Sequence, residues 1–159
     1  MTNEVLTKIR AKKAITIKDH IKFRTIFDVL SALFTDENQI STLHHGYKLN
    51  DHQQIWFPNI IPNDKKQITI KSKNGYGNFM SNNWDLIEQF DGTKTKAKRT
   101  ELGNKYLKNK MQFVTFAKIN EVTKGIGYHF IGIFVFDHYL DQDGKIMVYK
   151  KIADSYQFS

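Results

Sequence analysis

The residues best suited to chemistry are the histidines of one short segment, HHGYKLNDHQ, at positions 44–53. His44, His45, Asn50, Asp51 and His52 are the residue types that a metal-dependent nuclease of the His–Asn–His kind uses as general base, orienting amide and metal ligands. Such a nuclease carries these groups on a hairpin followed by a helix. The segment has no such pattern, and its spacing is too compressed. We therefore interpret it as a surface turn and predict no metal site.

Carboxylates offer a second route to nuclease chemistry, because a restriction-type core places an Asp before a Glu-X-Lys or Asp-X-Lys on the next strand. Asp137, Asp141 and Asp143 precede KIMVYKK, which has the lysines without the carboxylate. The chain has no cysteine, so a disulfide, a cysteine-ligated zinc and a thiol nucleophile are excluded. We assign no catalytic residue and expect no cofactor, and whether the chain is an enzyme stays open.

Aromatic and amide side chains gather in SKNGYGNFMSNNWD, from Ser72 to Asp85. Rings can stack on unpaired bases, and asparagine amides can pair with base edges. We expect this stretch to be a loop beside a binding surface, with Tyr76 exposed and Trp84 lining a pocket next to Asn83. The alternative is that Trp84 fills the core while the asparagines cap a turn.

Positive charge gathers between Lys94 and Lys110, where seven cations face a single glutamate. Lysines bind phosphates as point charges, which gives an affinity that depends on salt and not on base sequence. The alternative is a solvated loop without a ligand. Further lysines just upstream of the aromatic stretch favour the nucleic-acid interpretation. The predicted phosphate contacts are Lys71, Lys73, Lys96, Lys98 and Arg99.

Length and composition favour one globular domain. The chain has 159 residues, of which 40% are hydrophobic and 25% charged, and its net charge is +8. This charge favours a polyanionic partner, most often nucleic acid. No apolar run is long enough for a bilayer and the N-terminus lacks a secretory signal, so we expect no membrane partner and a cytoplasmic location. We divide the chain into a basic leader, 1–18, and a single α+β domain, 19–159.

Hydrophobic periodicity predicts the elements that position these residues. The spacing of apolar residues predicts one confident helix, Asp19–Phe34, with Thr16 or Asp19 as its N-cap. A shorter helix is predicted around Arg99–Leu107. Runs of apolar and β-branched residues predict strands at Gln54–Ile61, Lys66–Lys73, Gln112–Ile119, Gly127–Asp137 and Lys145–Ile152.

Two residues refine this pattern. Pro58 indicates that the first strand is an edge strand or is broken there. Gly132 lies inside the most apolar strand and predicts a bulge or a close backbone approach. The fold class is therefore α+β, with the N-terminal helix packed on a curved, mainly antiparallel sheet or a partly closed β-barrel.

A family resemblance covers residues 47–156. The segments IWFPNI, NNWD, FVTFAKI, YHFIGIFVFD and VYKKIAD resemble the β-rich specificity domains found beside bacterial restriction nucleases and helicases. They are similar to PUA-like and SRA-like modules, which read modified or flipped bases. The resemblance implies DNA recognition without chemistry, with a nuclease or helicase as a separate chain or domain. It also implies an aromatic pocket, for which Trp56, Trp84 and Tyr128 are the ring candidates.

The leading hypothesis is thus a nucleic-acid-binding specificity module, with DNA favoured. One alternative is a small metal-dependent nuclease of a restriction or mobile-element system, using His44, His45, His52 or Asp137. Another is a basic protein-interaction or inhibitor protein that binds an acidic partner.

Overall fold

The computed structural model describes residues 3–34, 47–72, 74–121, 125–142 and 144–158. Its helices are α1 (Asn3–Lys12), the 3-10 helix η1 (Ile17–Asp19), α2 (Ile26–Leu33), the 3-10 helix η3 (Asn63–Lys65), α3 (Lys66–Lys71) and α4 (Lys96–Lys108). Its strands are β1 (Ala14–Thr16), β2 (Lys22–Phe23), β3 (Lys48–Asn50), β4 (Gln53–Trp56), β5 (Tyr76–Met80), β6 (Leu86–Asp91), β7 (Gln112–Glu121), β8 (Gly125–Tyr139), β9 (Ile146–Ala153) and β10 (Ser155–Gln157). No helix among these residues is long and apolar enough to cross a membrane.

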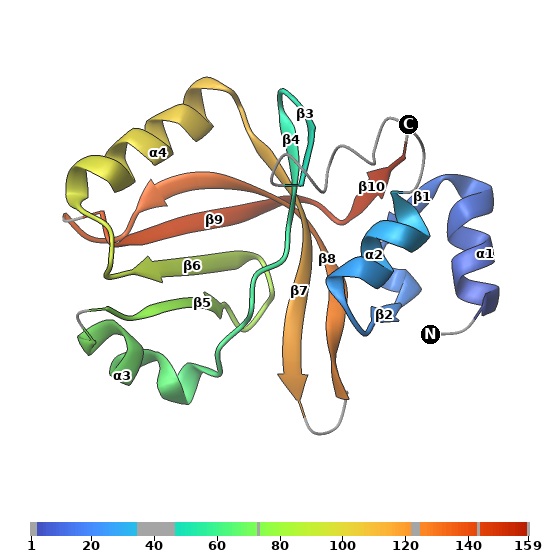
Figure 1. Ribbon diagram of the computed structural model, residues 1–159, viewed down its shortest axis with the longest axis horizontal. Coiled ribbons are helices and arrows are strands. Elements are labelled where there is room, and N and C mark those ends of the chain that lie inside the picture. The colour runs from blue at the N-terminus through green and yellow to red at the C-terminus, as the bar shows by residue number, and fades with distance from the viewer. Residues whose placement is uncertain (1–2, 35–46, 73, 122–124, 143, 159) are drawn as a thin grey trace.

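The strands form one large, twisted sheet and one small one (Figure 1). The large sheet has the order β3-β4-β7-β8-β9-β6-β5, and β2 adds to β8. All named strand pairs in it are antiparallel except β4–β7. The small sheet joins β1 to β10. The expected mixed, mainly antiparallel architecture is confirmed, but the described strands leave the sheet open and do not close it into a barrel.

The three C-terminal strands follow their predicted positions, and Gly132 marks an irregularity in the longest of them. Its φ is +122°, a backbone conformation that side-chain-bearing residues rarely adopt. The register of β7 against β8 shifts next to it, between Thr115 and Phe116. A Cβ at this position would meet the carbonyl oxygen of Ala153 at 2.6 Å. The predicted bulge and close backbone approach are therefore both present.

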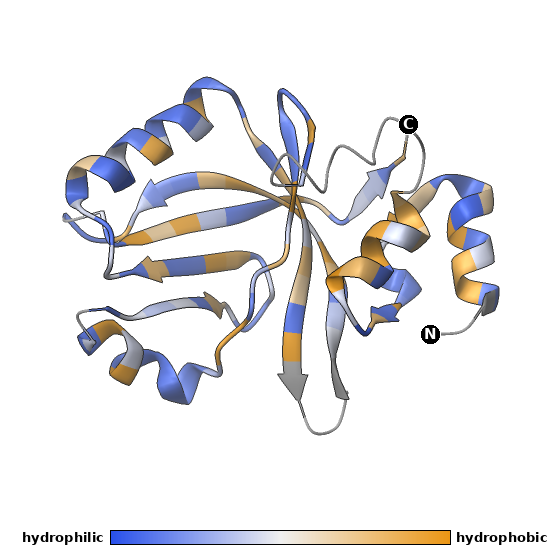
Figure 2. Ribbon diagram, in the orientation of Figure 1, coloured by the Kyte–Doolittle hydropathy of each residue, from blue (hydrophilic) through white to orange (hydrophobic). Residues whose placement is uncertain are grey.

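Two hydrophobic clusters fill the molecule, one on each face of the sheet. The first joins α1, α2 and the small sheet to β7 and β8, with Leu30 and Phe116 among its buried members. The second lies between α4 and the strands, around Phe113, Phe136 and Tyr149. Figure 2 shows α2 as predominantly hydrophobic and α4 as predominantly hydrophilic, which fits a helix embedded in the first cluster and one that covers the second. The predicted leader, residues 1–18, contributes buried residues of α1 to the first cluster. The division of the chain at residue 18 stays a prediction.

The predicted helix Asp19–Phe34 forms only in its second half. Thr25 caps α2 by accepting a hydrogen bond from the Asp28 amide at 3.1 Å. Thr16 and Asp19, the two predicted caps, instead form a capping box around η1. Between η1 and α2, the short strand β2 pairs with β8 in an antiparallel arrangement. Backbone N–H and C=O groups that would bond within a helix are paired with β8 instead.

Two local predictions are wrong. The described part of Lys66–Lys73 is the helix α3 and not the predicted strand. Two isoleucines two residues apart are too short a pattern to distinguish a strand from a short helix. In the helix they point to nearly opposite sides, and Ile68 is exposed instead of facing a core. The stretch Ser72–Asp85 contains β5 and a turn and is not the predicted loop. Pairing of β5 along β6 outweighs the weak strand propensity of its glycine and asparagine.

Candidate nucleic-acid interface

The hairpin β5–β6 places a row of polar side chains against the second hydrophobic cluster. Side chains alternate along a strand, so Tyr76, Asn78 and Met80 share one face of β5. Asn78 lies directly opposite Gln89 of β6. Both amides are buried, whereas Tyr76 at the end of the strand is 52% exposed. A sheet face that packs on a core thus carries amides where hydrocarbon is usual.

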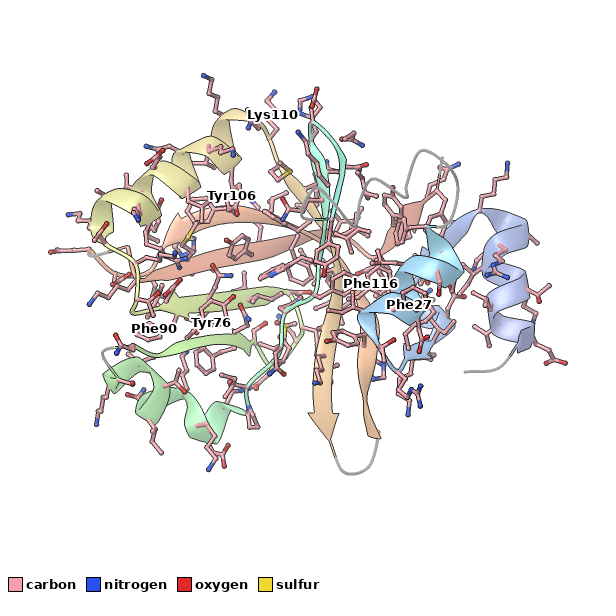
Figure 3. All side chains as sticks on the ribbon, viewed as in Figure 1. Phe27, Tyr76, Phe90, Tyr106, Lys110 and Phe116 are labelled. Atoms are coloured by element: carbon pink, nitrogen blue, oxygen red, sulfur yellow. The ribbon has the colours of Figure 1, made fainter. Side chains whose placement is uncertain are left out.

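Tyr76, Asn78 and Gln89 form a cluster with Tyr106 of α4 and Tyr149 of β9, which we call the amide–phenol cluster. The Gln89 Nε2 donates to the Tyr76 hydroxyl at 3.4 Å. The Tyr149 hydroxyl donates to the Gln89 Oε1 at 3.5 Å. Asn78 is only 1% exposed, and its Oδ1 is buried with no hydrogen-bond partner among the described residues. Figure 3 shows Tyr76 and Tyr106 in the same half of the molecule, away from Phe27 of α2.

Two phenols of this cluster, Tyr106 and Tyr149, are held in their protonated form. Burial raises the pKa of the Tyr149 hydroxyl well above its usual value, which the Tyr106 hydroxyl reinforces and the Arg99 guanidinium opposes. Burial also raises the pKa of Tyr106, again against the effect of Arg99. At neutral pH both phenols therefore keep an O–H group that can donate a hydrogen bond.

Arg99 does not face solvent, contrary to the expectation that it meets phosphates. It is 2% exposed and lies on the inner side of α4. Its guanidinium donates to the carbonyl oxygens of Gly144 (3.0 Å), Gln89 (3.0 Å) and Lys145 (3.3 Å) and to the Gln89 Oε1 (3.1 Å). A guanidinium used by four internal acceptors is not available to a phosphate, so we remove Arg99 from the proposed contacts.

The three expected pocket rings are not brought together. Trp56 is half-buried, and its ring centroid lies 4.8 Å from that of Tyr149, beside the amide–phenol cluster. Tyr128 packs on Phe57 at 5.7 Å in the first hydrophobic cluster, on the other face of the sheet. Trp84 lies at the turn of the hairpin, at the opposite end of β5 from Tyr76.

The turn at Trp84 has its own geometry. Trp84 has a φ of +64°, and it borders two hollows of about 300 and 220 Å³ that share Ile119 as a wall. The Asn83 Oδ1 accepts hydrogen bonds from the Ser81 hydroxyl at 2.8 Å and the Asp85 amide at 3.3 Å. Asn83 therefore stabilises the turn, in agreement with the alternative interpretation of this stretch, while Trp84 does border hollow space.

The predicted lysines that the structure describes are exposed at the Tyr76 end of the hairpin. Lys71 ends α3, and Lys96 and Lys98 lie in the first turn of α4. That end is closed by the Gly92 amide, which donates to the Gly75 carbonyl at 2.8 Å. Lys73 lies outside the described residues. The cations thus accompany Tyr76 and the amide–phenol cluster, and not Trp84.

The residues of the nuclease alternative do not gather in the described part of the chain. No group of three or more His, Asp or Glu that could hold a metal ion occurs there. His52 contacts the Asn109 carbonyl through Nδ1 at 2.8 Å, and Asp137 pairs with His138 at 2.7 Å. His44 and His45 lie outside the described residues.

Sequence reasoning missed the residues that complete the cluster: Asn78, Gln89, Tyr106 and Tyr149. Each comes from a different element, and nothing local marks Gln89, Tyr106 or Tyr149. The one available signal was the spacing of Tyr76 and Asn78, which places both on one face if the stretch is read as a strand.

Comparison with known proteins places this geometry in a family context. The family model of the SET and RING associated domain (SRA) matches residues 8–158. The fold is similar to the solved structure of "The 5-Hydroxymethylcytosine-Specific Restriction Enzyme AbaSI", with a TM-score of 0.64 and 17% sequence identity. The match covers 100% of this chain and 48% of that one, so the chain spans about half the length of the solved relative. No curated protein matches the chain.

Proposed function

This chain belongs to the SET and RING associated (SRA) domain family, and we propose that its specific role is to read a modified DNA base at the amide–phenol cluster. Family membership supports a DNA-binding module that recognises a modified base. The finer proposal is that a base turned out of the duplex meets Tyr76 and the buried amides of Asn78 and Gln89. Base flipping costs a few kcal/mol, which contacts in such a site offset.

The unpaired Oδ1 of Asn78 carries this proposal. A buried acceptor without a partner costs about 1–3 kcal/mol of stability, so folded proteins rarely keep one without a use. An amino or imino N–H on a base edge supplies the missing donor. The exposed ring of Tyr76 and the half-buried ring of Trp56 offer stacking faces for the same base.

Lys71, Lys96 and Lys98 hold the flanking phosphates in this proposal. They are exposed at the same end of the hairpin as Tyr76, so a duplex that presents a base to the cluster runs past them. Contacts of this kind set affinity and orientation but carry no sequence information.

We further propose a nuclease or helicase partner, in a separate chain or domain, in the cytoplasm. The solved relative is named as a restriction enzyme specific for 5-hydroxymethylcytosine. We therefore take modified cytosine as the first substrate to test.

The test is a comparison of binding to three otherwise identical duplexes that carry cytosine, 5-methylcytosine or 5-hydroxymethylcytosine at one position. We expect tighter binding to one of the modified duplexes. Asn78→Leu should abolish that preference without lowering the melting temperature, because it replaces an unpaired buried amide by hydrocarbon of similar shape. Gln157→Leu, an amide-to-leucine change at an exposed position of β10, is the matched control and should leave the preference unchanged.

Equal binding to all three duplexes would contradict modified-base reading. Plasmid nicking that depends on a divalent metal would favour the nuclease alternative instead. If the chain binds none of the duplexes at low salt, the result would favour the protein-interaction alternative.

A further inference from the structure

Arg99 reaches the amide–phenol cluster from α4, and its guanidinium contacts the side chain of Gln89. We infer that Arg99 is a positioning residue that fixes the orientation of the Gln89 amide, so that Gln89 offers a bound base a hydrogen-bond donor and not an acceptor. This inference rests on the proposed function and explains how the amide–phenol cluster would distinguish one base edge from another.

The amide orientation follows from the partners of its oxygen. The Gln89 Oε1 accepts from the Arg99 guanidinium at 3.1 Å and from the Tyr149 hydroxyl at 3.5 Å. Rotating the amide by half a turn would place its NH₂ group against a guanidinium, which has donors only. The hydrogen bond from Arg99 would be lost inside the protein, where unpaired polar groups are costly, whereas the Tyr149 hydroxyl can also accept and would not oppose the rotation. The oxygen therefore stays on the Arg99 side.

With its oxygen toward Arg99, the Gln89 amide points its nitrogen toward Tyr76. Nε2 donates to the Tyr76 hydroxyl at 3.4 Å. A primary amide has two N–H groups, so a second donor remains for a ligand atom. Asn78 lies directly opposite Gln89 in the sheet and adds an acceptor, its Oδ1. A donor beside an acceptor matches a base edge that offers one acceptor beside one N–H group, as base edges do.

Arg99 can fix this amide because it is itself fixed. Its remaining hydrogen bonds go to backbone carbonyls of Gly144, Lys145 and Gln89, which do not rotate as side chains do. The Tyr139 hydroxyl donates to the Arg99 carbonyl at 2.8 Å and holds the backbone of α4 at the same point. A lysine would keep the charge but lose the planar set of donors that reaches these acceptors together.

The experiment measures a preference ratio: the affinity for the duplex with the preferred modified cytosine, 5-methylcytosine or 5-hydroxymethylcytosine, divided by the affinity for the unmodified duplex. Gln89→Glu keeps an oxygen for Arg99 and replaces the donor by a second acceptor. We expect the ratio to fall about 10-fold, the effect of one lost hydrogen bond that leaves a partner unpaired, while the melting temperature is unchanged or higher. Arg99→Lys should lower both the ratio and the melting temperature.

A double-mutant comparison separates positioning from general stabilisation. In a Gln89→Ala background, Arg99→Lys should still lower the melting temperature but leave the ratio where Gln89→Ala put it, because the amide that Arg99 orients is gone. If Arg99→Lys lowers only the melting temperature, or if Gln89→Glu keeps the ratio, the inference is wrong while modified-base reading stands. A wild-type ratio of one for both modified duplexes overturns the proposed function and this inference with it.

Discussion

Single residues set the chemistry of the candidate interface, because the amides of Asn78 and Gln89 and the guanidinium of Arg99 lie among apolar side chains. Buried polar groups are stable only when paired, and here Gln89 and Arg99 pair with each other while the Asn78 Oδ1 stays unpaired among the described residues. The unpaired atom therefore identifies where a ligand would gain most. The neighbouring Tyr76 is exposed at the strand end, and in our proposal the base enters from this side.

Tyr76→Ala should weaken binding to the preferred modified duplex by about 1–3 kcal/mol, the range for removal of one ring that stacks on one base. The fold should survive, because the ring is half exposed and fills no core. Binding and melting measured on one preparation check both statements. Phe27→Ala is the matched control, since Phe27 is an exposed ring (67%) on α2, far from the cluster in Figure 3. Equally weakened binding in both variants would contradict a stacking role for Tyr76.

Asp137 gives a prediction for pH. Its carboxylate accepts from His138 at 2.7 Å and pairs with Lys150 at 3.3 Å. The hydrogen bond from His138 is the main cause that lowers its pKa below the ordinary value of 3.8, and Lys150 adds to it. A depressed carboxyl pKa stabilises the fold above pH 3.8, and this contribution disappears as the pH falls through the lower folded pKa.

Asp137→Asn should therefore lower the melting temperature at neutral pH and have no effect in strong acid. The decrease in stability at neutral pH should be below about 1 kcal/mol, because the pair is solvent-exposed and screened. Asp51→Asn, at an exposed aspartate, is the control and should change little at either pH. A larger effect of Asp137→Asn in acid than at neutral pH would contradict the sign of the shift.

At the scale of elements, the hairpin β5–β6 separates two features that are close in the sequence. Tyr76 and Trp84 lie at opposite ends of it, about 14 Å apart along β5 at the usual rise per residue. Helix α3 ends near Tyr76, and helix α4 begins there. Lys71, Lys96 and Lys98 therefore lie on that side. The arrangement favours the amide–phenol cluster over the hollows at Trp84 as the base site.

α2 supports the sheet from the opposite face and should matter for stability alone. Leu30 is buried in the first hydrophobic cluster, so Leu30→Ala should cost about 2–5 kcal/mol of unfolding free energy. The preference for a modified duplex should be unchanged in the fraction that remains folded. Denaturant unfolding measures the change, and Phe27→Ala on the exposed side of the same helix provides the comparison. Unchanged stability of Leu30→Ala would mean that α2 does not pack as described.

At the scale of the whole molecule, the net charge of +8 acts through its distribution. Lysines that face a duplex release counterions on binding, so each of them adds to the dependence of affinity on salt. Lysines elsewhere raise the net charge and the general attraction to DNA without touching a phosphate. Lysines that contact phosphates can be distinguished from the other lysines by removing the same number of charges at two different places.

Replacing Lys71, Lys96 and Lys98 together by Gln should weaken binding to all duplexes equally and reduce the salt slope by about 0.9 for each phosphate left without its lysine. The preference ratio should not change, because phosphates carry no base information. The control replaces three exposed lysines at the N-terminal end, Lys8, Lys13 and Lys18, which removes the same charge. If the control flattens the salt slope as much, the proposed phosphate-binding lysines are only part of a general field.

Local patterns in the sequence predicted much of this molecule. The apolar runs at Gln112–Ile119, Gly127–Asp137 and Lys145–Ile152 are strands, Gly132 is an irregularity, and the SRA-like resemblance agrees with the family that matches. These features depend on the period of side chains along a short segment, which the sequence displays directly. Tyr76 is exposed, as the sequence predicted.

The tertiary structure alone decided the roles of Arg99, Asn78 and Gln89. Arg99 lies among six other cations in the sequence, and only its place on the inner side of α4 turns it from a surface charge into a partner of Gln89. Asn78 and Gln89 become neighbours through the register of β5 on β6, and Tyr149 joins them through β9. Burial and pairing depend on residues far apart in the chain, so no local pattern can report them.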